Sequence, residues 1–93
     1  MTGTTLSSDG LDARRKRALF RAWHRGTREM DLVFGRFADA ELVGLDDADL
    51  GEFETLLSLQ DTDLFKWVTG AAAIPAEHDT PLFRRVRSYG SSL

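Results

Sequence analysis

Apolar side chains recur along the chain at the three- and four-residue spacing of amphipathic helices, and no stretch alternates in the manner of a β-strand. Five stripes can be followed. They comprise Leu11, Ala18, Leu19, Ala22 and Trp23; Met30, Val33, Phe34 and Phe37; Leu50, Phe53, Leu56 and Leu57; Leu64, Phe65, Trp67 and Val68; and Leu82, Phe83, Val86 and Tyr89. The pattern predicts an all-α fold, a single-domain bundle of about five short helices around one core.

Polar capping residues and glycines predict where these helices begin and end. The expected N-caps are Ser8 or Asp9 for the first helix, Asp46 for the third, Asp61 or Thr62 for the fourth, and Thr80, followed by Pro81, for the fifth. The expected helix ends are Gly26, Gly44, Gly70 and Gly90. Gly35 lies inside the second predicted helix, where glycine costs about 1 kcal/mol against alanine, so we expect close packing there.

A chain of 93 residues with 42% hydrophobic and 29% charged residues is typical of one small globular domain. We expect a helical domain at residues 11–90, a flexible N-terminal tail at 1–10 and a short C-terminal tail at 91–93. The absence of cysteine excludes disulfides and thiol chemistry and fits a reducing compartment. No apolar run could cross a bilayer and the first residues lack a secretory signal, so we expect a cytoplasmic protein without membrane insertion.

Charge is distributed unevenly along the chain. Residues 10–36 carry eight basic and three acidic side chains, whereas residues 37–63 carry nine acidic side chains and no basic one. The basic stretch followed by a glycine break allows an alternative function, a small helix-turn-helix-like regulator that binds nucleic acid through its first helix. Against this alternative stand the acidic segment, the net charge of −3 and the lack of a helix with the polar set that reads base edges.

Catalytic and cofactor motifs are missing from the sequence. His24 and His78 are far apart, neither stands at a metal-ligand spacing, and there is no dinucleotide fingerprint, phosphate-binding loop or nucleophile elbow. Glu29 and Asp31 lie near His24, but such a cluster at a helix start is usually solvated surface. We therefore expect no enzyme, and no catalytic, cofactor-binding or metal-binding residue.

The segment from Trp23 to Asp31 places Gly26 among charged residues between two predicted helices. A turn explains this glycine, and so does a contact surface, because a position without a side chain lets another backbone approach closely. Arg25 and Glu29 stand at i and i+4 with arginine first, the weaker order for a pair within a helix. We predict that Glu29 interacts with the positive N-terminus of the second helix and that Arg25 offers its guanidinium to a partner's carboxylate or carbonyl.

Two motifs resemble those of a known family. The segment RGTRE at residues 25–29, followed by an apolar residue and an aspartate, resembles the RGxxE motif of the SdhE family, the small FAD assembly factors of succinate dehydrogenase. The segment DTDLFKW at residues 61–67 is similar to that family's DxDLFxW segment. The resemblance extends over about residues 14–89, with mild departures at His24, where many members have arginine, and at Met30, where leucine is usual.

The resemblance implies a five-helix chaperone that binds the flavoprotein subunit of succinate dehydrogenase, and often that of fumarate reductase. It promotes covalent attachment of FAD to a histidine of that subunit, a reaction carried out largely by the flavoprotein itself. The expected factor therefore binds no FAD stably and acts by favouring the conformation in which the flavin and the histidine are aligned.

The resemblance also implies the partner-binding residues. They are His24, Arg25, Gly26, Arg28, Glu29, Asp31, Asp61, Asp63 and Trp67. Arg28 and Asp31 are expected at the rim of the interface. In the second motif an alternative stays open, in which Asp61 is a helix cap and Leu64, Phe65 and Trp67 pack inside the bundle.

Overall fold

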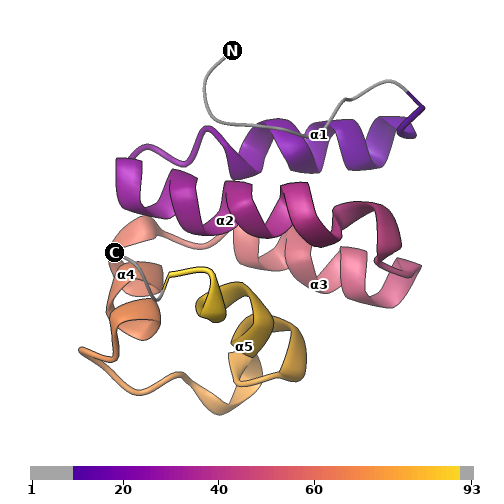
Figure 1. Ribbon diagram of the computed structural model, residues 1–93. Helices are drawn as coiled ribbons and strands as arrows, with labels where there is room; N and C mark the ends of the chain where they lie inside the picture. Colours follow the sequence, from indigo (N-terminus) through magenta and orange to yellow (C-terminus); the bar gives the residue numbers. More distant parts are fainter. Residues whose placement is uncertain (1–9, 91–93) are drawn as a thin grey trace.

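The computed structural model describes residues 10–90, and all of its regular elements there are helical (Figure 1). The α-helices are α1 (Ala13–Ala22), α2 (Arg28–Glu41), α3 (Asp47–Leu57), α4 (Asp61–Thr69) and α5 (Pro81–Ser88), and single 3₁₀ turns lie at Leu42–Gly44 and Ala76–His78. The predicted all-α fold with five short helices is confirmed. The predicted tails at 1–10 and 91–93 lie outside the described residues except for Gly10.

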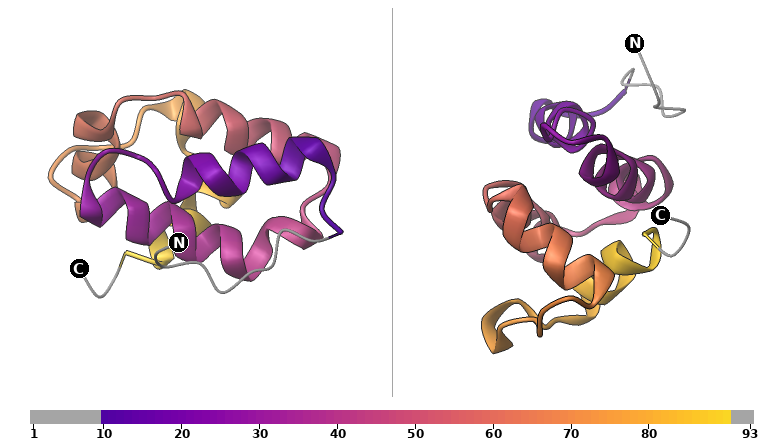
Figure 2. Two further views of the ribbon diagram at one scale, coloured as in Figure 1. Left: turned by 90° about the horizontal axis from the view of Figure 1, so that it is seen from above. Right: turned by 90° about the vertical axis from the view of Figure 1, so that its left-hand side faces the viewer.

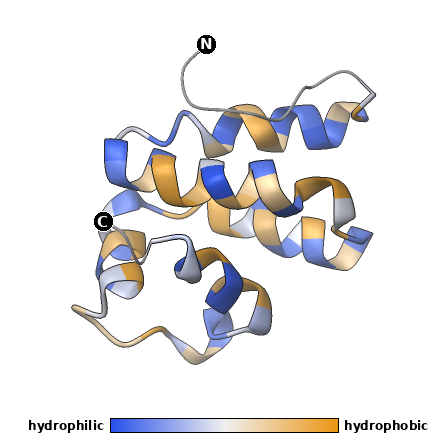
Figure 3. Cartoon of the chain, in the orientation of Figure 1, coloured by the Kyte–Doolittle hydropathy of each residue, from blue (hydrophilic) through white to orange (hydrophobic). Residues whose placement is uncertain are grey.

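Helix α2 is the centre of the bundle. It runs antiparallel beside α1 and also packs against α4 and α5, while α3 packs against α1 and α5 (Figures 1 and 2). Hydrophobic and hydrophilic residues are interspersed along the helices (Figure 3). The core side of α2 contributes Met30, Val33, Phe34 and Phe37, all fully buried. The rings of Phe34 and Phe37 lie 6.0 and 5.1 Å from that of Phe53 on α3, which joins the helices through one aromatic cluster.

Gly35 is the contact point between α2 and the residue that ends α1. A Cβ atom at position 35 would lie 2.3 Å from the indole ring of Trp23, so only glycine fits without a shift of the ring. The Trp23 indole is in turn fixed by a hydrogen bond from Nε1 to the Asp39 carboxylate, 3.1 Å long. The expected close packing at Gly35 is confirmed, and its physical reason is a tryptophan ring lying directly on the α2 backbone.

Several predicted helix boundaries agree with the structure. The Asp46 carboxylate accepts a hydrogen bond from the Asp49 N–H at 2.8 Å, the Thr80 hydroxyl caps α5, and Gly70 ends α4 with φ +83°. Four predictions are wrong. Helix α1 begins after the N-cap Asp12 rather than after Ser8 or Asp9, and it ends at Ala22, before Gly26. Gln60 occupies the N-cap position of α4, so Asp61 is its first helical residue, and α2 ends at Glu41 because the chain tightens into a 3₁₀ turn before Gly44.

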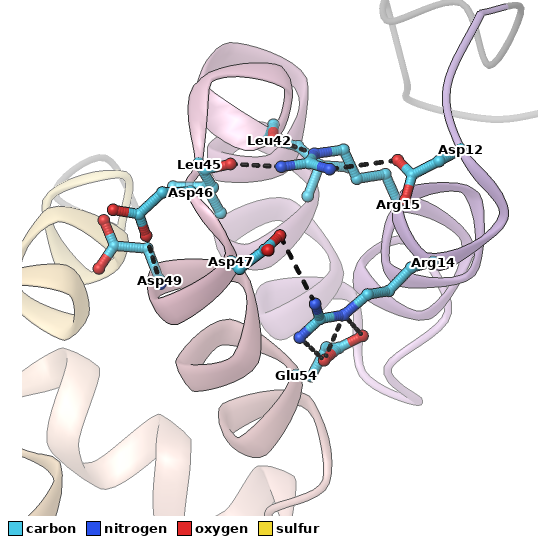
Figure 4. A network of polar contacts seen from close by, with 9 residues as sticks. All are labelled: Asp12, Arg14, Arg15, Leu42, Leu45, Asp46, Asp47, Asp49 and Glu54. Atoms are coloured by element: carbon cyan, nitrogen blue, oxygen red, sulfur yellow. Dashed lines mark hydrogen bonds and ion pairs between the residues drawn. The ribbon is translucent and has the colours of Figure 1, made fainter.

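Two basic residues of α1 form contacts with α3 and with the turn that precedes it (Figure 4). The Arg14 guanidinium donates to both Glu54 carboxylate oxygens at 2.8–3.0 Å. The Arg15 guanidinium donates to the backbone carbonyl of Leu42 at 3.2 Å and to that of Leu45. Arg14 and Arg15, which the nucleic-acid alternative would use to bind phosphate, thus join α1 to α3 and to the turn before it.

The Arg14–Glu54 contact predicts a pH-dependent contribution to stability. The hydrogen bond from Arg14, and then the charges of Arg14, Arg17 and Arg21, hold the Glu54 pKa below its ordinary value of 4.5. A carboxyl whose pKa falls on folding stabilises the native state above its unfolded pKa, and this contribution is lost as the pH drops through the folded pKa. Glu54→Gln should therefore lower the urea midpoint at about pH 7, and the difference from the parent should vanish at sufficiently acidic pH. A difference that stays constant through this acid range would contradict the assignment.

Candidate functional site: the loop between α1 and α2

The loop between α1 and α2 adopts a conformation that requires glycine. Gly26 has φ +120°, outside the range that side-chain-bearing residues readily adopt. Thr27 then starts α2, because its hydroxyl accepts a hydrogen bond from the Met30 N–H at 3.3 Å. The prediction that Gly26 separates the first two helices is confirmed. The prediction that Arg25 and Glu29 share one helix face is wrong, because α2 begins only at Arg28.

Arg25 is directed into the protein. Its Nε and Nη2 atoms lie 2.9 and 2.8 Å from one carboxylate oxygen of Asp61, and its Nη atoms also donate to the backbone carbonyls of Leu57 and Leu59. Its guanidinium carbon lies 5.4 Å from the centre of the Phe34 ring. The Arg25 and Asp61 side chains are only 7% and 15% exposed. We call this set of contacts the Arg25 clamp.

The roles expected for Arg25 and Asp61 from the sequence differ from those in the structure. Arg25 was expected to present a free guanidinium to a partner, but its donors bind Asp61 of α4, Leu57 at the end of α3 and Leu59 in the connection between them. Asp61 is the first residue of α4 rather than its N-cap, and one oxygen of its carboxylate binds Arg25. The clamp ties the RGxxE segment to the DxDLFxW segment, which are 36 residues apart between Arg25 and Asp61.

Asp31, in the first turn of α2, also holds the loop between α1 and α2. Its carboxylate accepts a hydrogen bond from the backbone N–H of Arg25, and the residue is half-buried. Thr27, Asp31 and the clamp together hold the backbone on both sides of Gly26. The loop is therefore presented on a preorganised frame, which lowers the ordering cost of any binding event at this surface.

The exposed residues of this region form a continuous surface between the loop and α4. A shallow, mostly apolar groove of about 360 Å³ is lined by Thr27, Glu29, Asp61, Thr62, Phe65 and Lys66. Gly26 and Arg28 are also exposed beside it. We call these residues the loop–α4 surface. Phe65 is 42% exposed, which corrects its expected place in the core.

The other predicted site residues are divided between surface and packing roles. Asp63 is exposed in the first turn of α4. Trp67 is half-buried, with its ring 6.3 Å from Phe83 and 5.7 Å from His78, which supports the packing alternative for this residue. His24 is exposed at the end of α1 and lies beside the loop rather than in the groove.

Sequence reasoning missed three features of this region. Phe65 and Lys66 as groove residues were not anticipated, because Phe65 fits the apolar stripe of α4 as well as the buried Leu64 does. Phe20, 63% exposed on α1, was also missed. A signal for Phe20 was available, since it stands next to the core stripe of Ala18, Leu19 and Ala22 but is out of phase with it.

The described part of the chain contains no cluster of three or more His, Asp or Glu side chains that could hold a metal ion. Within residues 10–90, no helix combines the length and the apolar character needed to cross a membrane.

Comparison with known proteins identifies the relatives of this chain. The model of a family described as flavinator of succinate dehydrogenase matches residues 16–90. The FAD assembly factor SdhE of Acetobacter pasteurianus is 38% identical over 81 residues, which cover 87% of this chain and 74% of the relative. No solved structure matches the chain.

Two mitochondrial proteins are also similar, both named succinate dehydrogenase assembly factor 2. The protein of Mycosarcoma maydis is 41% identical over 69 residues, which are 74% of this chain and 29% of the relative. The protein of Dictyostelium discoideum is 30% identical over 79 residues, which are 85% of this chain and 56% of the relative. Because the family model covers most of the chain, including both motifs and the Arg25 clamp, this protein belongs to the family of succinate dehydrogenase flavinators.

Proposed function

We propose that the protein is an assembly chaperone that binds the flavoprotein subunit of succinate dehydrogenase and promotes its covalent flavinylation with FAD. The observation that carries the proposal is the loop–α4 surface. It combines an exposed glycine, the exposed Glu29 and an apolar groove at Phe65, all held on a fixed frame. An apolar patch with a few oriented polar groups at its edge suits protein recognition.

The proposed mechanism is conformational and requires no catalytic group of this chain. Glu29 and the groove bind one conformation of the flavoprotein better than others, and that conformation aligns the flavin with the histidine that it modifies. Preferential binding of the competent conformer raises its population and with it the rate of attachment. In this proposal FAD stays with the flavoprotein, and the flavoprotein of fumarate reductase is a second client.

Assembly is favoured over nucleic-acid binding for two reasons. The relatives are named as assembly factors, and the structure occupies Arg14 and Arg15 in contacts with α3 and its preceding turn. A helix that has lost these two cations to internal contacts offers a weaker phosphate-binding surface than its sequence indicated.

The proposal is tested by following covalent flavin directly. The purified apo flavoprotein subunit is incubated with FAD, with and without this protein, and flavin fluorescence is read on the denatured polypeptide. We expect the protein to raise the initial rate of covalent labelling and Glu29→Ala to reduce this gain while unfolding at nearly the parent urea concentration. Equal labelling rates with and without the protein, at concentrations that saturate binding, would exclude the proposed function.

A further inference from the structure

The outward face of α1 carries a second unusual surface. Arg17, Phe20 and Arg21 stand at i, i+3 and i+4 of α1, so they share one side of the helix, and His24, two residues beyond its end, stacks on Phe20. All four are exposed, on the side of α1 that faces away from the buried Ala18, Leu19 and Ala22. We call these four residues the α1 outer face.

The aromatic centre of the α1 outer face is held in place. The rings of Phe20 and His24 are stacked, with centroids 3.9 Å apart and planes 13° apart. His24 Nδ1 lies 2.6 Å from the Phe20 carbonyl oxygen, which fixes the imidazole against the helix end. Phe20 thus remains 63% exposed yet orientationally restricted, a state in which binding costs little side-chain entropy.

The two arginines of the α1 outer face remain available. Among residues 10–90, neither the Arg17 nor the Arg21 guanidinium forms an ion pair or a hydrogen bond, in contrast to Arg14 and Arg15 on the same helix. Their charges help to lower the Glu54 pKa, but neither forms an ion pair with Glu54. An exposed aromatic ring between two guanidiniums that form no ion pair within residues 10–90 is a composition that protein interfaces favour for binding acidic partners.

The position of the face relates it to the loop–α4 surface. His24 is adjacent in sequence to Arg25, so the α1 outer face runs directly into the RGxxE loop. A partner seated on Gly26 and Glu29 would need to extend only a short way to reach Phe20. The two surfaces are therefore suited to be contacted by one partner.

We infer that the α1 outer face is a second contact surface of this protein, which binds an acidic segment of the flavoprotein subunit beside the segment seated on the loop–α4 surface. The inference rests on the proposed function. A protein segment is favoured over nucleic acid because Arg14 and Arg15 of the same helix are engaged internally, which leaves a short basic patch centred on an exposed aromatic ring rather than a continuous basic stripe.

The test compares binding of the purified flavoprotein subunit to the parent chain and to variants of the α1 outer face. Arg17→Glu with Arg21→Glu should weaken the complex about tenfold, mainly through slower association, and should reduce its salt dependence. Phe20→Ser should weaken it about fivefold, mainly through faster dissociation. Arg17→Gln with Arg21→Gln should give an intermediate effect without placing acidic side chains near Glu54. Arg87→Glu, at another exposed arginine, on α5, is the matched control and should bind within twofold of the parent.

The outcomes separate this inference from the proposed function. Parent chain that does not bind the flavoprotein would overturn the proposed function, and the inference with it. Parent chain that binds, with all α1 variants folded and within twofold of it, would overturn the inference alone. So would a parent dimer in sedimentation that the variants dissociate, or a salt-sensitive RNA complex that the variants lose, if flavoprotein binding is unchanged.

Discussion

Arg25→Ala is expected to lower the free energy of unfolding by about 3 kcal/mol, a large part of the roughly 5–15 kcal/mol that stabilises a small domain. The substitution leaves the Asp61 carboxylate, 15% exposed, without its cation. It also removes the donors to the carbonyls of Leu57 and Leu59 and the cation over Phe34. Removing one member of such a pair costs more than the pair contributes, because a desolvated charge is left behind.

Urea denaturation of a double-mutant cycle measures this directly. Arg25→Ala, Asp61→Ala and the double variant should give a coupling energy above about 1 kcal/mol, as expected for residues within one polar network. Arg85→Ala is the matched control, because Arg85 also pairs with a carboxylate, Glu41, but its side chain is 44% exposed. The control should lose much less stability. If Arg25→Ala were as stable as the control but failed to bind the flavoprotein, Arg25 would contact the partner itself.

Gly26→Arg is expected to weaken flavoprotein binding about 100-fold, equivalent to about 2.7 kcal/mol, and to suppress the gain in covalent flavin. The new side chain would start from the exposed loop and project over the surface that Glu29 and Phe65 border. The substitution also forces a residue with a side chain to adopt φ +120°, which costs about 1–3 kcal/mol of stability. The variant should therefore be less stable than the parent and be assayed at a temperature where it is folded.

Gly26→Ala separates these two effects. Alanine imposes the same backbone strain, and its Cβ has room, since the nearest atom outside the neighbouring residues is an Asp61 carboxylate oxygen at 3.5 Å. The alanine variant should lose similar stability but keep its affinity within a few-fold of the parent. Equal loss of binding in both variants would show that loop conformation, rather than an unobstructed surface, decides recognition.

The helices could be predicted because their signals are local. Apolar spacing, the Asp46 and Thr80 caps and the Gly70 end depend on neighbouring residues only, and each is found in the structure. The strained glycine of the loop could also be anticipated, since Gly26 interrupts an otherwise helical pattern. These features need no knowledge of the tertiary arrangement.

The site was predicted less well because its chemistry depends on distant residues. The order of Arg25 and Glu29 argued against a stabilising pair within one helix, but nothing in the sequence showed that α2 begins only at Arg28 or that Arg25 reaches Asp61. The same limit applies to Phe65 and Phe20, because a hydrophobic residue at helical spacing does not reveal which neighbours cover it. The partners of Arg14 and Arg15 likewise depend on the packing of α3 beside α1, which their own positions in the sequence do not reveal.

The central claim, that the loop–α4 surface contacts the flavoprotein, is tested most directly by site-specific photo-crosslinking. A photoreactive residue is placed at Glu29, at Phe65 or at Val43. Val43 is 62% exposed and lies about 20 Å from Glu29, beyond the other end of α2. Each variant is irradiated with the apo flavoprotein subunit. The account predicts crosslinks from positions 29 and 65 and none above background from position 43. Crosslinks from position 43 as strong as those from 29 and 65, or from 43 alone, would contradict it.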